Sequence, residues 1–183
     1  GAHTFGGLSL LITQRGALFL TDTFVNYEPT SEDIAELAIL ASKEIKRFGI
    51  TPKIALASHS NFGSRDSESA RKMRRALQLV RDAAPELEID GEMQGGSALS
   101  EVLRKRAMPN SALSGEANLL VFPNLDSANI TLGVVRTMTE GLHVGPILLG
   151  SALPVHILSP TVTSRGVVNM AALAAVQASH PAV

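Results

Sequence analysis

The spacing of apolar residues predicts two hairpin strands followed by an amphipathic helix. Two short apolar runs, 8–13 and 17–21, flank a polar turn, which is typical of a β-hairpin. From Ile34 to Phe48 the apolar residues instead recur every three or four positions, as on one face of a helix. Thr30 is the expected N-cap of this helix, and Gly49 follows its last turn.

The rest of the chain alternates between short apolar runs and helical spacing. Further strands are predicted at 54–57, 87–90, 118–122 and 155–158, with helices at about 67–83, 126–138 and 164–178. The helix 126–138 leads to the segment 145–150. Such alternation is typical of an α/β fold. We therefore expect a three-layer αβα domain with a mostly parallel sheet and the opening hairpin at its edge. No internal repeat or linker interrupts the pattern, so residues 1–183 are predicted to form a single lobe.

Composition excludes several classes of protein. The 183 residues are 45% apolar, enough for a buried core, and the net charge of −1 gives no basic field for nucleic acid or an anionic membrane. Cysteine is absent, which excludes disulfides and thiolate chemistry. No apolar run reaches the roughly 20 residues that span a bilayer, and we expect a cytoplasmic protein with no membrane partner.

The strongest local pattern for ligand binding is the loop 58–65, between an apolar strand and a helix. Ligands of doubly wound sheets bind at the carboxyl ends of strands, where backbone amides can approach an anion. The candidate anion ligands are Ser60, Asn61, Ser64 and Arg65. Spacing alone favours the plainer interpretation, a connecting loop that caps itself. No Walker or GxGxxG motif occurs, so no nucleoside triphosphate or nicotinamide site is expected.

Two further groups of polar residues have structural interpretations that we favour. Arg71 and Arg75 are four apart and could meet phosphates, but a solvated helix face is the simpler explanation. Asp126 and Asn129 follow Asn124, an expected N-cap, and capping is a commoner role for them than catalysis.

The histidines do not indicate a metal site. His59 lies in the candidate anion loop, whereas His143 and His156 border predicted strands. No pair of histidines has a spacing such as HExxH. Structural roles are therefore favoured for all three, and no metal or other cofactor is expected within this chain.

The segment 154–166 resembles the active-site segment of the phosphate acetyltransferases, which move acetyl between coenzyme A and phosphate. That family has PVNDLSRG here, followed after a spacer by Asp-Ile-Val. With Leu158-Ser159 aligned, the family's substrate-contacting serine falls on Ser159, its neighbouring arginine on Pro160 and the aspartate proposed as its base on Gly166. The resemblance therefore implies vestigial positions and no catalytic residue.

Other motifs carry the resemblance from about residue 7 to 178. Four of them are closer to the C-terminal domain of the bacterial NADP-dependent malic enzymes: Ser60-Asn61-Phe62-Gly63-Ser64, Gly91-Glu92-Met93-Gln94, Met108-Pro109-Asn110-Ser111 and Pro123-Asn124-Leu125-Asp126. In those proteins a phosphate-acetyltransferase-like module follows a part that oxidises and decarboxylates malate. The chain opens on Gly1-Ala2-His3 without methionine, and we expect it to be the second lobe of such a module.

The resemblance implies a regulatory and oligomerisation lobe that senses acetyl-CoA, or a related CoA ester, without transferring acetyl. The effector-binding residues that it implies are Ser60, Asn61, Ser64, Arg65, Asp126, Asn129 and Ser159. NADP and a divalent metal would be bound in the malic enzyme part. The expected partners are a CoA ester, the first lobe and the malic enzyme part of the same polypeptide, and further copies in a homodimer or higher oligomer.

The closing helix is the candidate contact with the first lobe or a partner subunit, because Val167, Met170, Leu173 and Val176 recur at helical spacing. Two other functions stay open. One is an active phosphate acetyltransferase in which Arg165 substitutes for the missing arginine. The other is a scaffold that binds no ligand.

Overall fold

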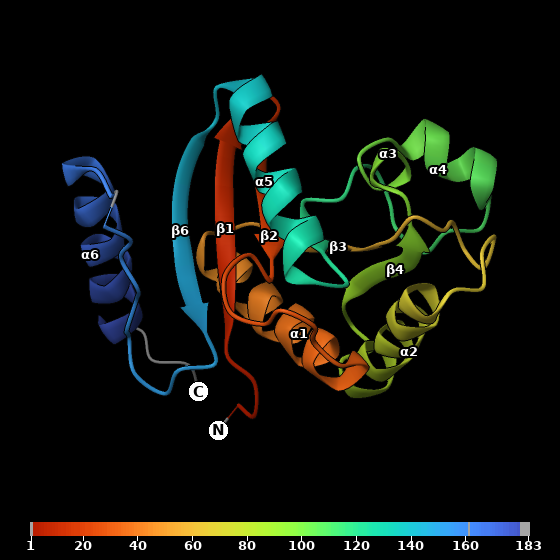
Figure 1. Cartoon of the computed structure of the whole chain (residues 1–183), viewed down its shortest axis with the longest axis horizontal. Helices are drawn as coiled ribbons and strands as arrows, with labels where there is room; N and C mark the ends of the chain where they lie inside the picture. Colours follow the sequence, from red (N-terminus) through yellow and green to blue (C-terminus); the bar gives the residue numbers. More distant parts are fainter. Residues whose placement is uncertain (1, 161, 180–183) are drawn as a thin grey trace.

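In the computed structural model, residues 2–160 and 162–179 are described, and they form a six-stranded sheet with helices on both faces (Figure 1). The strand order is β4-β3-β5-β2-β1-β6. The strands are β1 (Gly6–Thr13), β2 (Gly16–Thr21), β3 (Lys53–Ala57), β4 (Glu88–Met93), β5 (Leu119–Val121) and β6 (Leu142–Leu149). The three pairs from β4 to β2 are parallel, whereas β1 is antiparallel to both its neighbours.

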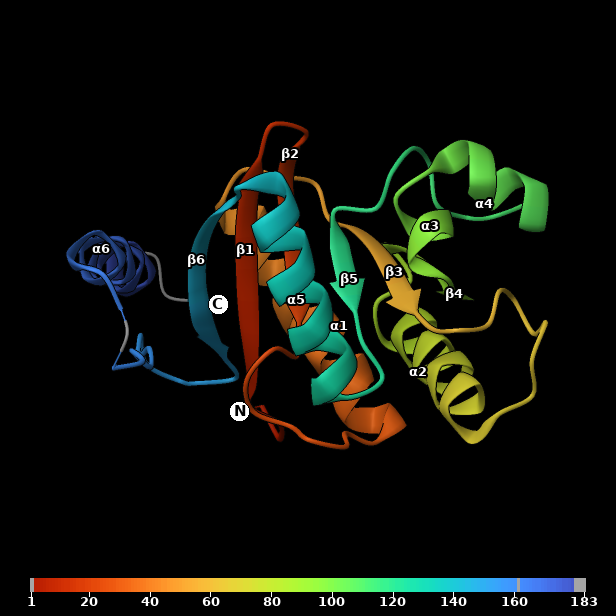
Figure 2. The ribbon, with the colours of Figure 1, turned by 45° about the horizontal axis from the view of Figure 1, so that its top comes forward.

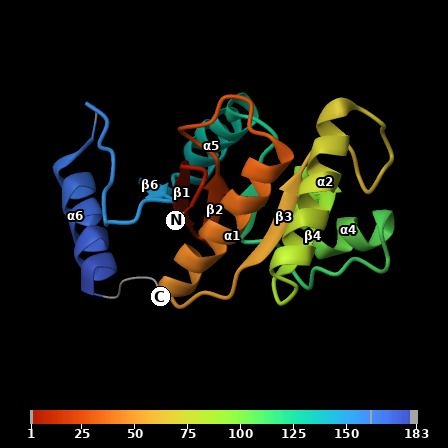
Figure 3. The ribbon, with the colours of Figure 1, turned by 90° about the horizontal axis from the view of Figure 1, so that it is seen from below.

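The helices complete the predicted three-layer architecture (Figures 2 and 3). They are α1 (Ser31–Arg47), α2 (Glu68–Ala83), α3 (Gly95–Ala98), α4 (Glu101–Ala107), α5 (Leu125–Thr139) and α6 (Ser164–Ser179). One core packs α1, α2 and residues of α6 against the sheet. A second core, on the other face, includes Ala98 of α3 and Ala128 of α5. Helix α6 lies beyond β6, at the edge of the sheet (Figure 1).

The opening hairpin forms as predicted, but it lies inside the sheet. Strand β6 pairs antiparallel with β1, from Leu142 opposite Ile12 to Leu149 opposite Gly6, and so takes the edge position. Its side chains Val144, Ile147 and Leu149 are buried, and the burial of this apolar area stabilises the pairing of β6 with β1. The edge strand at the other end is β4, the strand predicted near residues 87–90.

The start of α1 shows how local sequence sets an element. The Thr30 hydroxyl accepts a hydrogen bond from the Asp33 amide, and the Asp33 carboxylate accepts one from the Thr30 amide. This capping box confirms the predicted N-cap. Hydrogen bonds from the hydroxyls of Thr30 and Thr4 also hold the pKa of Asp33 below its usual value. At the other end, Gly49 has a φ of +73°, which favours glycine after a helix.

The predicted strand at 155–158 is wrong. This segment belongs to the connection between β6 and α6 and pairs with no strand (Figure 2). Val155 and Ile157 remain 51% and 43% exposed, so the apolar run that suggested a strand is not buried in the core. The outer edge of β6 is instead met by a side chain, because the Leu148 amide donates to Nδ1 of His156 over 3.3 Å.

Helices α3 and α4 were not predicted from the sequence, and a buried arginine holds them in place. Arg104 is fully buried and donates to the carbonyls of Ser97, Leu113 and Gly115. Its charge is compensated by backbone dipoles rather than by a carboxylate. Over the described part of the chain, no helix has the length and apolar character needed to cross a membrane.

Candidate functional site

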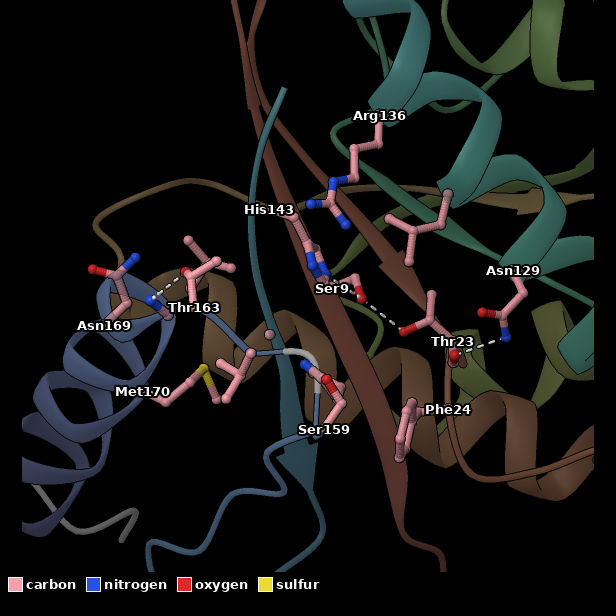
Figure 4. Close-up of a pocket in the computed structure, with 16 residues that line it drawn as sticks. Ser9, Thr23, Phe24, Asn129, Arg136, His143, Ser159, Thr163, Asn169 and Met170 are labelled. Atoms are coloured by element: carbon pink, nitrogen blue, oxygen red, sulfur yellow. Dashed lines mark hydrogen bonds between the residues drawn. The ribbon is translucent and has the colours of Figure 1, made fainter. Parts of the chain in front are cut away.

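A cavity of about 420 Å³ lies over strands β1 and β6, between α5 and α6 (Figure 4). Its walls come from β1, the turn after β2, α5, β6 and the segment that leads into α6. These elements are far apart in the sequence and meet only because β6 pairs with β1. A cavity of this size accommodates part of a cofactor-sized ligand.

The residues that line the cavity give it the charge of an anion site. Among the described residues that line it, Arg136 is the only one with a permanent charge, and none is an aspartate or a glutamate. The Arg136 guanidinium points from α5 towards His143 on β6 (Figure 4). Its side chain makes no hydrogen bond or ion pair with any described residue, so its donors are available to a ligand.

His143 is the only lining residue that titrates near neutral pH, and it lies at the end of a hydrogen-bonded chain. Its Nε2 is 3.1 Å from the Ser9 hydroxyl, which is 2.9 Å from the Thr23 hydroxyl. Burial, and to a smaller extent the Arg136 charge, lowers the pKa of His143 below 6.5. The imidazole is therefore neutral at pH 7.

Two of the predicted effector residues, Asn129 and Ser159, line this cavity. The Asn129 amide group donates to the Thr23 carbonyl over 2.8 Å and so connects α5 to the turn after β2. Gly166 also lines the cavity, whereas Pro160 does not. A side chain at residue 166 would begin 2.7 Å from Cγ2 of Val162, so a larger residue there requires that segment to shift.

The loop 58–65 lies at the carboxyl end of β3, as predicted, but not in the cavity. Two of its side chains satisfy its own backbone, because Ser60 accepts from the Arg65 amide and Ser64 from the Asn61 amide. Asn61 accepts from the Gln94 amide, which follows β4. Ser60 is fully buried. Arg65 is exposed, and its side chain has no ion pair with a described residue.

The remaining predicted residues take structural places. Asn124 caps α5 by accepting from the Ser127 amide over 3.0 Å, which confirms the N-cap, and Asp126 is exposed in the first turn, outside the cavity. On α2, Arg71 pairs with Asp66 over 2.8 Å. Both side chains of this pair are exposed, so Arg71 lies on a solvated helix face, as favoured from the sequence.

Residues 1–175 match the family model described as phosphate acetyl/butaryl transferase. This chain belongs to that family. A phosphotransacetylase from Streptococcus pyogenes superposes on 97% of the chain with a TM-score of 0.93 and 32% identity, over 55% of its own length. The phosphate acetyltransferase of Bacillus subtilis is 33% identical over 97% of the chain and 55% of the relative.

Greater identity is found with malic enzymes. The chain is 73% identical over 99% of its length to an NAD-dependent malic enzyme of Rhizobium meliloti, and 51% identical over 97% to an NADP-dependent malic enzyme of Escherichia coli. It covers 24% of each relative. The chain therefore corresponds to the phosphate-acetyltransferase-like part of these longer proteins, whose names indicate NAD in one case and NADP in the other.

Within this transferase-family lobe, the sequence pointed to the segment around Ser159 and, on the opposite wall, only to Asn129. Ser9 and Arg136 were not predicted as site residues, and His143 was considered only as a structural histidine. Arg136 lies in the last turn of α5, where a cation is ordinary, so its sequence position gave no signal. Among the described residues, no three His, Cys, Asp or Glu side chains gather as a metal site.

Proposed function

We propose that this chain is a regulatory and assembly lobe of a malic enzyme, which binds acetyl-CoA or a related CoA ester without transferring its acetyl group. The observation that supports this most is the cavity between α5 and α6, which offers an arginine and no carboxylate. The malic enzyme relatives, at 73% and 51% identity, support the choice of parent protein. Its malate oxidation would use NAD or NADP and a divalent metal outside this chain.

Binding without turnover follows from which groups face the ligand. Ser159 and Asn129 would contact the acyl end in the cavity, and Arg136 would attract the negative charge of the ligand. Acyl transfer from acetyl phosphate to CoA needs a base that takes the proton of the attacking thiol. None of the described lining residues is a carboxylate, Gly166 has no side chain with which to act as one, and the proposal gives the neutral His143 a role in anion binding rather than that of a base. The lobe then keeps affinity and loses catalysis.

The loop 58–65 would contact the outer part of the CoA ester. Coenzyme A carries phosphates at some distance from its thioester, and in this proposal one molecule contacts both regions. In this proposal Ser60, Asn61 and Ser64 shape the loop backbone, Arg65 supplies an exposed cation, and Asp126, in the first turn of α5, is a further contact of the ligand.

The two walls of the cavity offer a route for regulation. On α5, Ile130, Val134 and Met138 are four residues apart and 66%, 52% and 80% exposed. On α6, Val167 and Val176 are 41% and 52% exposed, whereas Met170 is buried in the lobe's own core. We propose that these apolar faces contact the rest of the polypeptide or a partner subunit. A ligand between the two helices then favours one arrangement of the assembly.

The test uses the complete parent enzyme. We expect acetyl-CoA to change both the rate of malate oxidation and the distribution of oligomers seen by mass photometry, with free CoA as the control. Replacing Arg136 by Gln should weaken both responses without changing malate oxidation in the absence of effector. Formation of acetyl phosphate from acetyl-CoA and phosphate, abolished by Ser159→Ala, would instead establish the active transferase.

A further inference from the structure

The hydrogen bonds around Ser9 determine which nitrogen of His143 carries the proton. The Thr23 hydroxyl is 3.1 Å from the Gly7 carbonyl, and when its hydrogen is directed there, Thr23 accepts from Ser9. Ser9 has then used its own hydrogen and must accept from Nε2 of His143. Neutral His143 therefore carries its proton on Nε2, and Nδ1 keeps a lone pair.

This assignment excludes one chemistry and permits another. A histidine that donates to a serine cannot also accept its proton, so Ser9 is not an activated nucleophile. Nδ1 is instead the basic atom of the cavity. If a second proton binds there, His143 becomes a cation without breaking its hydrogen bond to Ser9.

The charged groups around His143 decide when that second proton binds. Strand β1 contributes none, and the side chain of α5 that lines the cavity with a charge is Arg136. The only charged residue of α6, Arg165, lies outside the lining. Helix α1 packs in the core on the opposite face of the sheet from Leu11, the register partner of His143. In the absence of a ligand, the charge that acts on the imidazole is thus positive.

We propose that Arg136 and His143 form an anion site for a phosphate group, and that His143 takes up a proton when the phosphate binds. The negative charge between the two side chains offsets the repulsion from Arg136 and gives the Nδ1–H an acceptor. This pair replaces, from the opposite wall, the cation that the family resemblance places at Pro160. The proposal deepens the proposed function and rests on it only in placing the ligand in this cavity.

Proton uptake fixes the sign of the pH dependence. The complex holds one more proton than the free lobe, so affinity rises as pH falls. For one proton the dissociation constant changes by up to about tenfold per pH unit between the free and bound pKa values of His143. Phosphate titrates in the same range and would obscure this. Sulfate stays a dianion and is the better first probe.

In the experiment, sulfate is titrated into the purified chain at pH values from about 5.5 to about 8, and the His143 imidazole is followed by NMR. This range brackets the ordinary pKa of histidine, about 6.5. We expect the His143 resonance to shift towards the protonated form and the affinity to increase at low pH. His143→Gln, which retains an N–H donor for Ser9, should abolish the pH dependence. Arg136→Gln should weaken sulfate binding by at least about tenfold. His156→Gln, outside the cavity, is the matched control.

Two further ligands separate the source of the phosphate and the two proposals. If inorganic phosphate protonates His143, the ligand of the site is a free phosphate. If His143 takes up a proton with acetyl-CoA but not with its 3′-dephospho form, the ligand is the 3′-phosphate of CoA. If acetyl-CoA binds but none of these anions changes the protonation of His143, this inference is overturned and the proposed function stands. If an anion protonates His143 but acetyl-CoA does not bind, this inference stands and the proposed function is overturned.

Discussion

The loop 58–65 and the cavity between α5 and α6 both contain serine, asparagine and arginine, but only the cavity places its arginine beside an imidazole. In the loop, the Ser60, Ser64 and Asn61 side chains accept hydrogen bonds from nearby backbone amides. In the cavity, Arg136 and the Nδ1 of His143 are left available. Polar residues that are contiguous in sequence tend to cap themselves. Groups that bind a ligand gather here from elements that are distant in sequence.

A pair of glycines gives the largest test of this difference. Gly145 lines the cavity with a φ of +130°, and a side chain there would begin 2.8 Å from the Leu8 carbonyl. Gly63 in the loop has a φ of +84° and no atom within 4 Å of such a side chain. We expect Gly145→Ala to cost about 3 kcal/mol and Gly63→Ala about 1 kcal/mol of unfolding free energy in urea. Equal costs would show that β1 does not confine the cavity floor.

Serine substitutions in the loop separate a structural role from a binding role. Ser60→Ala leaves the part-buried Arg65 amide without its acceptor and should lower the unfolding free energy by about 1 kcal/mol. Ser64→Ala, at an exposed position, should change it by less than about 0.5 kcal/mol. A Ser60→Ala variant with unchanged urea stability would contradict self-capping as the main role of this side chain.

Acid should weaken the lobe through its buried imidazoles. Burial lowers the pKa values of both His143 and His156 below 6.5, so the unfolded chain binds protons that the folded chain does not. Stability is then fully present above pH 6.5 and is lost as pH falls from there towards the lowered folded values. Thermal unfolding should show a smaller loss for His143→Gln than for the wild type. Sulfate should also reduce the loss, because it favours protonated His143 in the folded state.

The smallest expected effect belongs to Arg65. Its exposed side chain would meet a CoA phosphate in water, where an ion pair contributes about 0.2 to 1 kcal/mol. Arg65→Ala should therefore weaken acetyl-CoA binding by less than about fivefold, and the effect should disappear at high salt. Arg75→Ala, on the neighbouring helix, is the control. A larger loss for Arg65 than for Arg136 would place the principal cation in the loop.

Much of the fold follows from local sequence because local interactions set it. The Thr30 capping box and the apolar stripe from Ile34 to Phe48 specify α1 without help from the rest of the chain. Helix α3 was missed because Gly95-Gly96 is typical of a loop. The run Val155–Leu158 suggested a strand because a pattern of apolar residues does not reveal whether a neighbouring strand is present.

The candidate site was only half predictable for a related reason. Family resemblance located Ser159 and Asn129, both of which line the cavity. Arg136 and Ser9 have no motif, and they reach the cavity only because β6 pairs with β1 rather than leaving the hairpin at the edge. That pairing joins residues more than a hundred positions apart, which no local pattern records.

The most direct test of the central claim is an isothermal titration of acetyl-CoA into the purified chain and into its Arg136→Gln variant, with free CoA as the control. We predict saturable binding to the wild-type chain that is at least about tenfold weaker in the variant, because the cavity loses its only permanent charge. A flat trace for the wild type, or equal affinity in the two proteins, would contradict a CoA-ester site in this cavity.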